Sequence, residues 1–125
     1  MHVERVDFVS FLTQDLARAK RFYTGVLGLE IESEGDNDLE LTCGQVTLDI
    51  FDPSSIGQPF APSAGLALRV ADVDAARAEL EAQGVEFDGE TIVTDVCRQA
   101  WFKDPDGNAL MLHRRFAPFD DGRMP

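Results

Sequence analysis

The chain has 125 residues and a mass of 13.8 kDa, which suffices for one compact domain or for two half-size modules that share a core. Its 44% hydrophobic and 27% charged residues exclude a disordered chain, and no apolar stretch has the length of a membrane span. Twenty-three acidic against 11 basic residues give a net charge of −12, which argues against nucleic acid and anionic membranes as partners and favours cationic small molecules. Cys43 and Cys97 lack metal-ligand spacing, and no secretory signal is recognisable, so we expect reduced thiols in a cytoplasmic protein.

The first half of the chain has the pattern of a βαβββ module. Residues 6–12 are rich in β-branched and aromatic side chains and predict a strand. Asp15 is a candidate helix N-cap, and Gly28 would end the helix that follows. Three further short strands are predicted over residues 29–33, 39–43 and 45–51.

The second half repeats this pattern after about 57 residues. A strand over 65–70 precedes a helix capped by Asp72 or Asp74 and closed by Gly84, and strands are predicted over 85–87, 98–103 and 108–114. We therefore expect one domain, divided as follows: module one about 5–52, a Pro-containing linker about 53–63, module two about 64–114, and an irregular tail 115–125.

Alternation along the predicted strands separates an apolar face, expected to pack on the helix, from a mixed face. If the mixed faces curve inward, they form a half-apolar hollow with polar anchors, as in small-ligand sites. The residues expected to line it are Phe8, Ser10, Thr47, Asp49, Phe51, Arg69, Met111 and His113. An ordinary solvated sheet face is the alternative, and alternation alone leaves open which face carries Gln99 and Trp101.

Residues 5–114 resemble the glyoxalase/bleomycin-resistance/dioxygenase superfamily, also called vicinal oxygen chelate proteins. The resemblance rests on the segment 13–29, with Asp15-Leu16, Phe22-Tyr23 and Leu27-Gly28, and on the segments 66–76 and 102–108 in the second module. It implies an α+β fold in which two βαβββ modules form a cupped, mostly antiparallel sheet with the helices outside. It also implies a homodimer.

Many members of this superfamily hold a divalent metal on four inward side chains, which are typically His or Glu. The matching positions in this sequence are Phe8, Asp49, Gly65 and Met111. Phenyl and glycine offer no donor, and a thioether is a poor ligand for hard cations, so only Asp49 could coordinate. We therefore expect no metal cofactor at these positions, with a relocated divalent metal site as the alternative.

These observations favour a metal-free protein that resembles bleomycin-resistance proteins and sequesters a cationic or aromatic small molecule. The alternative is a glyoxalase-like lyase or isomerase, or a dioxygenase, that uses a non-standard metal site or Asp49 and His113 as an acid/base pair. Asp49, Arg69 and His113 could instead satisfy one another without catalysing a reaction. A third hypothesis is an accessory module with no strong ligand.

Overall fold

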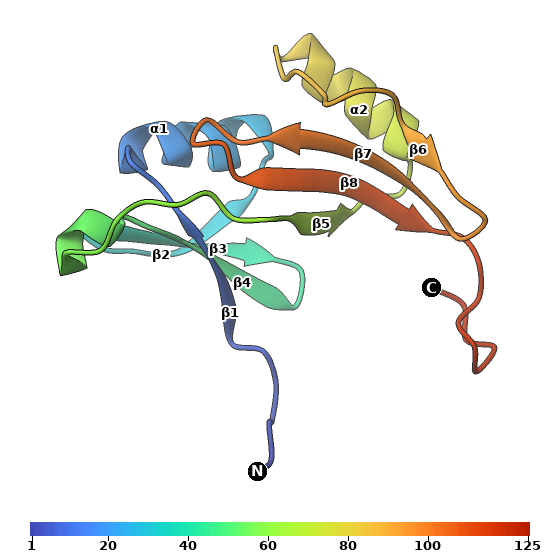
Figure 1. Ribbon diagram of the computed structural model, residues 1–125, viewed down its shortest axis with the longest axis horizontal. Helices are drawn as coiled ribbons and strands as arrows, with labels where there is room; N and C mark the ends of the chain where they lie inside the picture. The colour runs from blue at the N-terminus through green and yellow to red at the C-terminus, as the bar shows by residue number, and fades with distance from the viewer. The chain divides into compact units, whose positions relative to one another are not determined.

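The computed structural model describes residues 1–125 and divides into two compact units, each of which is described by itself (Figure 1). Unit 1 comprises Met1–Ser63 with Asp104–Asn108, and unit 2 comprises Ala64–Lys103 with Ala109–Pro125. Each unit contains a 4-stranded mixed sheet that is not closed, with a helix on one face. The predicted α+β fold of two βαβββ modules is therefore confirmed. The structure contains no helix that is long and apolar enough to cross a membrane.

The sheet of unit 1 has the strand order β1-β4-β3-β2. Its strands are β1 (Phe8–Leu12), β2 (Glu30–Glu34), β3 (Asp38–Cys43) and β4 (Val46–Phe51). β1 runs parallel to β4, whereas β3 pairs antiparallel with both β4 and β2. A short 3₁₀ turn, η2 (Pro53–Ile56), lies within the predicted linker.

The helical segment of unit 1 begins as predicted at Asp15, whose carboxylate accepts a 3.0 Å hydrogen bond from the backbone N–H of Arg18. α1 (Leu16–Lys20) continues into a π-helical turn, η1 (Arg21–Val26). The Thr24 hydroxyl donates to the Lys20 carbonyl at 2.6 Å, which is the carbonyl that the Thr24 N–H would use in an α-helix. Gly28 follows with a positive φ of 73°, a conformation suited to glycine.

The core of unit 1 lies between this helical segment and one face of the sheet. The buried strand side chains have the parity expected from alternation: Phe11, Leu39, Leu41, Leu48 and Ile50. Ala19, Phe22 and Tyr23 are buried on the helical side, and the rings of Phe22 and Tyr23 meet edge to face. The opposite face of the sheet is therefore left without a helix.

The turn Asp104–Asn108, which joins two strands of unit 2, belongs by its contacts to unit 1. The buried Asp104 carboxylate accepts from the Tyr23 hydroxyl at 2.6 Å and from the Asn108 amide at 2.8 Å. The side chain of Asp106 is fully buried and accepts from Thr13, Arg18 and the Gln14 backbone. Burial, followed by the charge and hydrogen bond of Asp104, raises the pKa of Tyr23 far above its ordinary value, so this hydroxyl is a permanent donor.

The sheet of unit 2 has the order β5-β8-β7-β6, with β5 parallel to β8 and the other pairs antiparallel. Its strands are β5 (Leu66–Arg69), β6 (Ile92–Val93), β7 (Cys97–Lys103) and β8 (Ala109–Arg115). Between β5 and β6, α2 (Val73–Ala82) begins at Asp72, one of the two predicted caps, whose carboxylate accepts from the Ala75 N–H at 3.0 Å.

The prediction of a strand over residues 85–87 is wrong. Only Phe87 forms an isolated bridge there, to Phe102, whereas the edge strand is β6 further along the chain. Residues 85–87 and β6 both contain β-branched or aromatic residues, but only β6 pairs with β7 over its whole length. Ile92 pairs with Gln99, and Val93 pairs with Arg98. A 2-residue edge strand is specified by its neighbour and hardly at all by its own sequence.

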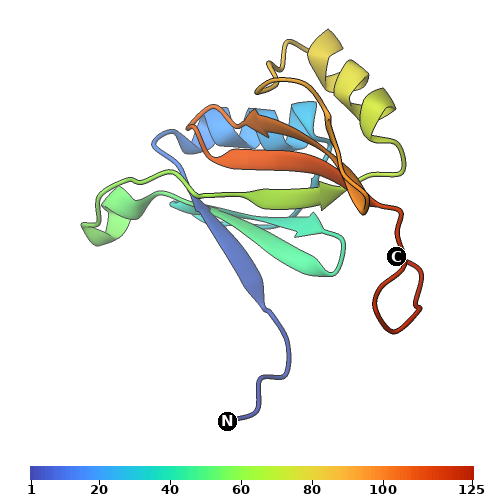
Figure 2. The same ribbon diagram turned by 45° about the vertical axis from the view of Figure 1, so that its right-hand side comes forward.

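One face of the unit 2 sheet packs on α2 (Figure 2). Its buried residues are Ala100, Phe102, Leu110 and Leu112, with Val73 and Leu80 buried on the helix. The residues after Arg115 form no helix or strand, but they are anchored, because the backbone N–H groups of Phe116 and Ala117 donate to the Val96 carbonyl.

Candidate functional site

The helix-free side of the unit 1 sheet, here called the open face of unit 1, carries the five predicted ligand residues of this unit. They are Phe8, Ser10, Thr47, Asp49 and Phe51. Phe8 pairs with Thr47, and Ser10 pairs with Asp49, which places these side chains in adjacent cross-strand rows. Phe8 is 56% exposed, which is unusual for a phenyl ring. The ligand-binding role of these residues stays a prediction.

Two carboxylates that the sequence analysis missed lie on this face. Glu40 pairs directly with Asp49, and Asp38 pairs with Phe51. Their positions on either side of the buried Leu39 were a usable signal, because residues two apart on a strand share a face. None of the four strands of this sheet contains Lys, Arg or His, so every charged side chain that these strands place on the open face of unit 1 is acidic.

Asp49 lies at the centre of this acidic group. One of its oxygens accepts a 2.9 Å hydrogen bond from the Ser10 hydroxyl, while the other, Oδ1, is buried without a partner. Carboxylate oxygens of Asp38, Glu40 and Asp49 lie within 4.8 Å of one another. Burial raises the pKa of Asp49, the Ser10 hydrogen bond opposes this, and the neighbouring Asp38 and Glu40 carboxylates raise the pKa further.

The raised pKa predicts that Asp49→Asn stabilises the protein at neutral pH. A carboxyl whose folded-state pKa exceeds its ordinary value of 3.8 favours folding while protonated, and this contribution is lost as the pH rises through the folded-state pKa. Asn cannot ionise and keeps an oxygen for Ser10. Thermal unfolding of both proteins across the acidic range should show the variant as the more stable one at pH 7, and the difference should vanish well below pH 3.8. A difference independent of pH would contradict the assignment.

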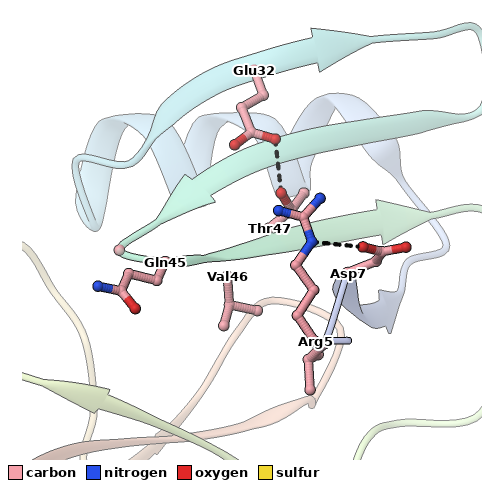
Figure 3. A pocket seen from close by; sticks show the side chains of 8 residues that line it. Arg5, Asp7, Glu32, Gln45, Val46 and Thr47 are labelled. Atoms are coloured by element: carbon pink, nitrogen blue, oxygen red, sulfur yellow. Dashed lines mark hydrogen bonds and ion pairs between the residues drawn. The ribbon is translucent and has the colours of Figure 1, made fainter. Parts of the chain in front are cut away.

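A cavity of about 320 Å³ opens in unit 1 at the β3–β4 turn (Figure 3). Glu32 points toward Thr47 and accepts its hydroxyl at 2.8 Å, while Arg5 pairs with Asp7 at 3.1 Å. Thr47 is the only predicted ligand residue that lines this cavity, and Glu32 and Arg5 were not predicted. A second hollow of about 280 Å³ lies beside Thr13 and Phe60.

The helix-free side of the unit 2 sheet, here called the open face of unit 2, carries two cross-strand rows. Arg69, His113 and Gln99 form the polar row, because His113 pairs with both of the others. The apolar row consists of Ala67, Met111 and Trp101, with Met111 in the middle. The register therefore decides what alternation left open: Gln99 and Trp101 share the face of the three predicted ligand residues of this unit, Arg69, Met111 and His113.

The charged residues in the strands of unit 2 are all basic. Lys103 pairs with Asp88, and Arg115 donates to the backbone carbonyls of Ala117 and Pro118. By contrast, the side chains of Arg69 and His113 make no hydrogen bond or ion pair within unit 2, whose ion pairs involve Arg77, Arg98, Lys103 and Arg123. The predicted acid/base role of His113 with Asp49 stays a prediction, because the two residues belong to different units.

The four positions that match the metal ligands of the superfamily do not supply a ligand set. Phe8 has no donor, and Met111 offers only a thioether. At Gly65, a Cβ would lie 3.3 Å from Cζ3 of Trp101, so an indole ring occupies the space where a ligand side chain would begin. The Asp38, Glu40 and Asp49 carboxylates are the remaining oxygen donors that lie together, and such groups are common on protein surfaces without an ion.

Sequence comparison identifies the family. The model of the Glyoxalase/Bleomycin resistance protein/Dioxygenase superfamily matches residues 5–112. The chain belongs to this superfamily. It is also 33% identical over 129 residues to the uncharacterized protein YaeR of Escherichia coli K12, with 90% of this chain and 98% of the relative covered.

Solved structures of the superfamily share the fold. TnmS3, an antibiotic binding protein from Streptomyces sp. CB03234, is 31% identical with a TM-score of 0.77, covering 92% of this chain and 98% of that chain. Lactoylglutathione lyase from Agrobacterium tumefaciens has a TM-score of 0.78 at 20% identity, covering 89% of this chain and 93% of that chain. The superfamily fold thus carries both binding and catalysis, and the site residues must distinguish them.

Proposed function

We propose that this protein binds and sequesters a small organic cation, or an aromatic compound that carries a positive charge, without a divalent metal. The observation that carries the proposal is the open face of unit 1, where Asp38, Glu40 and Asp49 gather on a sheet whose strands have no basic residue. The likeness to an antibiotic binding protein supports a binding role over a catalytic one.

The chemistry of this face suits a cation with an apolar body. Carboxylates attract the charge, and the exposed Phe8 ring offers both apolar area and a negative π face. The unpartnered Oδ1 of Asp49 leaves carboxylate charge that a ligand cation would offset. The net charge of −12 raises the local concentration of any cation.

Isothermal titration calorimetry with benzyltrimethylammonium, against neutral benzyl alcohol, tests this proposal. We expect the cation to bind saturably and the alcohol to bind at least about tenfold more weakly, because only the cation gains from the carboxylates. Glu40→Gln and Asp49→Asn should each weaken binding of the cation by about five- to tenfold, and Phe8→Ala by a similar factor.

Glu34→Gln provides the matched control. Like Glu40→Gln and Asp49→Asn, it removes one negative charge from the unit 1 sheet, but Glu34 already pairs with Lys20 at 2.6 Å and is not one of the three grouped carboxylates. Its affinity for the cation should equal that of the wild type. An equal loss in this control would mean that overall charge, and not the open face of unit 1, attracts the ligand. No saturable binding of the cation would contradict the proposal.

A second candidate function is a lyase, isomerase or dioxygenase with a non-standard metal site. The specific observation in its favour is the proximity of three carboxylates that could each offer one oxygen to a hard cation. Elemental analysis of protein purified without chelators distinguishes the two. The binding proposal expects no stoichiometric divalent metal, whereas one metal ion per chain, lost in Asp49→Asn, would favour the enzyme.

Two further parts of the proposal come from the family resemblance and the sequence. We expect a homodimer, which sedimentation equilibrium would test, and a cytoplasmic location. An accessory module without a strong ligand would be favoured if both the cation and its aromatic relatives fail to bind.

A further inference from the structure

The polar row of unit 2 presents N–H donors that have no strong acceptor within this unit. The Arg69 side chain is exposed and unpaired, and it lies directly beside His113 across the parallel β5–β8 pair. Gln99 lies on the other side of His113 across the antiparallel β7–β8 pair. Side chains opposite one another on neighbouring strands are about 5 Å apart, so Arg69 and Gln99 flank His113, and their long side chains can converge on a small group bound above it.

The Gln99 amide is oriented by one short hydrogen bond. Its Oε1 accepts from the indole Nε1 of Trp101 at 2.7 Å, which satisfies the carbonyl of the amide. Its Nε2 has only a 3.9 Å contact to the Cys97 sulfur, a weak acceptor, and therefore keeps an unused N–H. Arg69 presents several N–H donors and His113 at least one, so a group that accepts hydrogen bonds suits this row.

The apolar row lies one step along the strands from these donors. Met111 is flanked by Ala67 and Trp101, and the indole ring covers Gly65, where a Cβ would lie 3.3 Å from Cζ3. Ala67 and Gly65 have little or no side chain, so the indole and the thioether form the surface of this row. A ligand that lies across both rows has a polar end and an apolar body.

We infer that the open face of unit 2 binds a small organic carboxylate, with its carboxylate on Arg69, His113 and Gln99 and its apolar body on Met111 and Trp101. This inference rests on the proposed small-molecule binding but concerns a different face and the opposite charge. A carboxylate is acceptor-only and fits the planar fork of an arginine. Arg69 is the one permanent cation of this face with a free side chain, because Arg115 donates to backbone carbonyls and Lys103 pairs with Asp88. A single free guanidinium matches a monoanion better than a phosphate dianion in a protein of net charge −12.

Trp101 is the only tryptophan of the chain, so its fluorescence reports on this face alone. We expect hexanoate, titrated at constant ionic strength, to change the Trp101 emission saturably. Hexanamide, which has the same chain length and no charge, should bind at least about tenfold more weakly. Arg69→Gln should weaken hexanoate binding by about tenfold or more, because it removes the charged half of the donor row.

Arg114→Gln is the matched control, since Arg114 lies in β8 next to His113 but on the opposite face, and its loss should leave hexanoate binding unchanged. Equal weakening in both variants, or no saturable response to hexanoate in the wild type, would overturn the inference. The outcome is separable from that of the cation experiment. If hexanoate binds, also in Asp49→Asn, while benzyltrimethylammonium does not bind the wild type, the proposed cation site is refuted and the carboxylate site is upheld. If benzyltrimethylammonium binds and hexanoate does not, the cation site is upheld and the carboxylate site is refuted.

Discussion

Asp104→Ala is expected to lower the free energy of unfolding by about 3 to 5 kcal/mol. The Asp104 carboxylate accepts from Tyr23, from the Asn108 amide and from the backbone N–H groups of Asp106 and Asn108. Tyr23 and Asn108 are both 0% exposed, so water cannot replace the lost acceptor without opening the core of unit 1. Each buried donor left without a partner costs about 1 to 3 kcal/mol, and two side-chain donors lose theirs.

Chemical denaturation followed by circular dichroism measures this loss. Asp88→Ala is the control, because Asp88 pairs with Lys103 at the surface, where both side chains are more than half exposed. Such an exposed pair contributes less than about 1 kcal/mol. A double-mutant cycle with Tyr23→Phe isolates the Tyr23–Asp104 bond. If Asp104→Ala costs no more than Asp88→Ala, the turn Asp104–Asn108 does not stabilise unit 1 in the way its hydrogen bonds indicate.

Phe102→Ala is expected to destabilise the protein by about 3 to 5 kcal/mol, the largest effect foreseen in unit 2. Phe102 is 0% exposed, packs on the α2 side of the sheet, and its ring lies 5.2 Å from that of Phe87. Truncation would leave a cavity that the rigid sheet cannot fill. Phe102→Leu keeps much of the volume and should cost less than about 2 kcal/mol, which gives a measurable value if the alanine variant does not fold.

Trp101→Ala is the comparison for this prediction, because the adjacent residue of β7 points to the opposite face. Although the indole is larger than the phenyl ring, it is only half-buried, and we expect a loss of about 1 kcal/mol. Unfolding should be followed by circular dichroism, since this variant has no tryptophan. Equal losses for Trp101→Ala and Phe102→Ala would show that the open face of unit 2 is packed as tightly as its core.

The two sheets differ in charge although they repeat one topology. In unit 1 the charged strand residues, such as Glu40 and Asp49, are acidic, whereas in unit 2 they are basic, as at Arg69. A net charge of −12 predicts attraction of cations to the whole molecule, but it does not reveal a face with the opposite preference. The two binding experiments therefore test the faces separately.

Much of the candidate site could be foreseen because strand side chains alternate with a period of two. This rule correctly placed Ser10 and Asp49 on one face, and Arg69 and His113 on another, once the strands were located. The same rule places Glu40 on the face opposite to Leu39 and Leu41, whereas Asp38 lies just outside the predicted strand 39–43 and joins this face only because β3 begins one residue earlier. Alternation could not predict the edge strand β6, because a pattern of two residues is too short to show a period or to identify the strand that it pairs with.

The sequence by itself determined the βαβββ repeat, the helix start at Asp15, and the lack of suitable metal donors at Phe8, Gly65 and Met111, but it left the start of the second helix open between Asp72 and Asp74. These features depend on local residue patterns and on side-chain chemistry, both of which can be identified from the sequence. Only the tertiary structure decided that Glu40 lies opposite Asp49, that Gln99 and Trp101 join Arg69 and His113, and that Asp104 accepts from Tyr23. These pairings join residues distant in sequence, and they are fixed by strand register and core packing, which no single segment encodes.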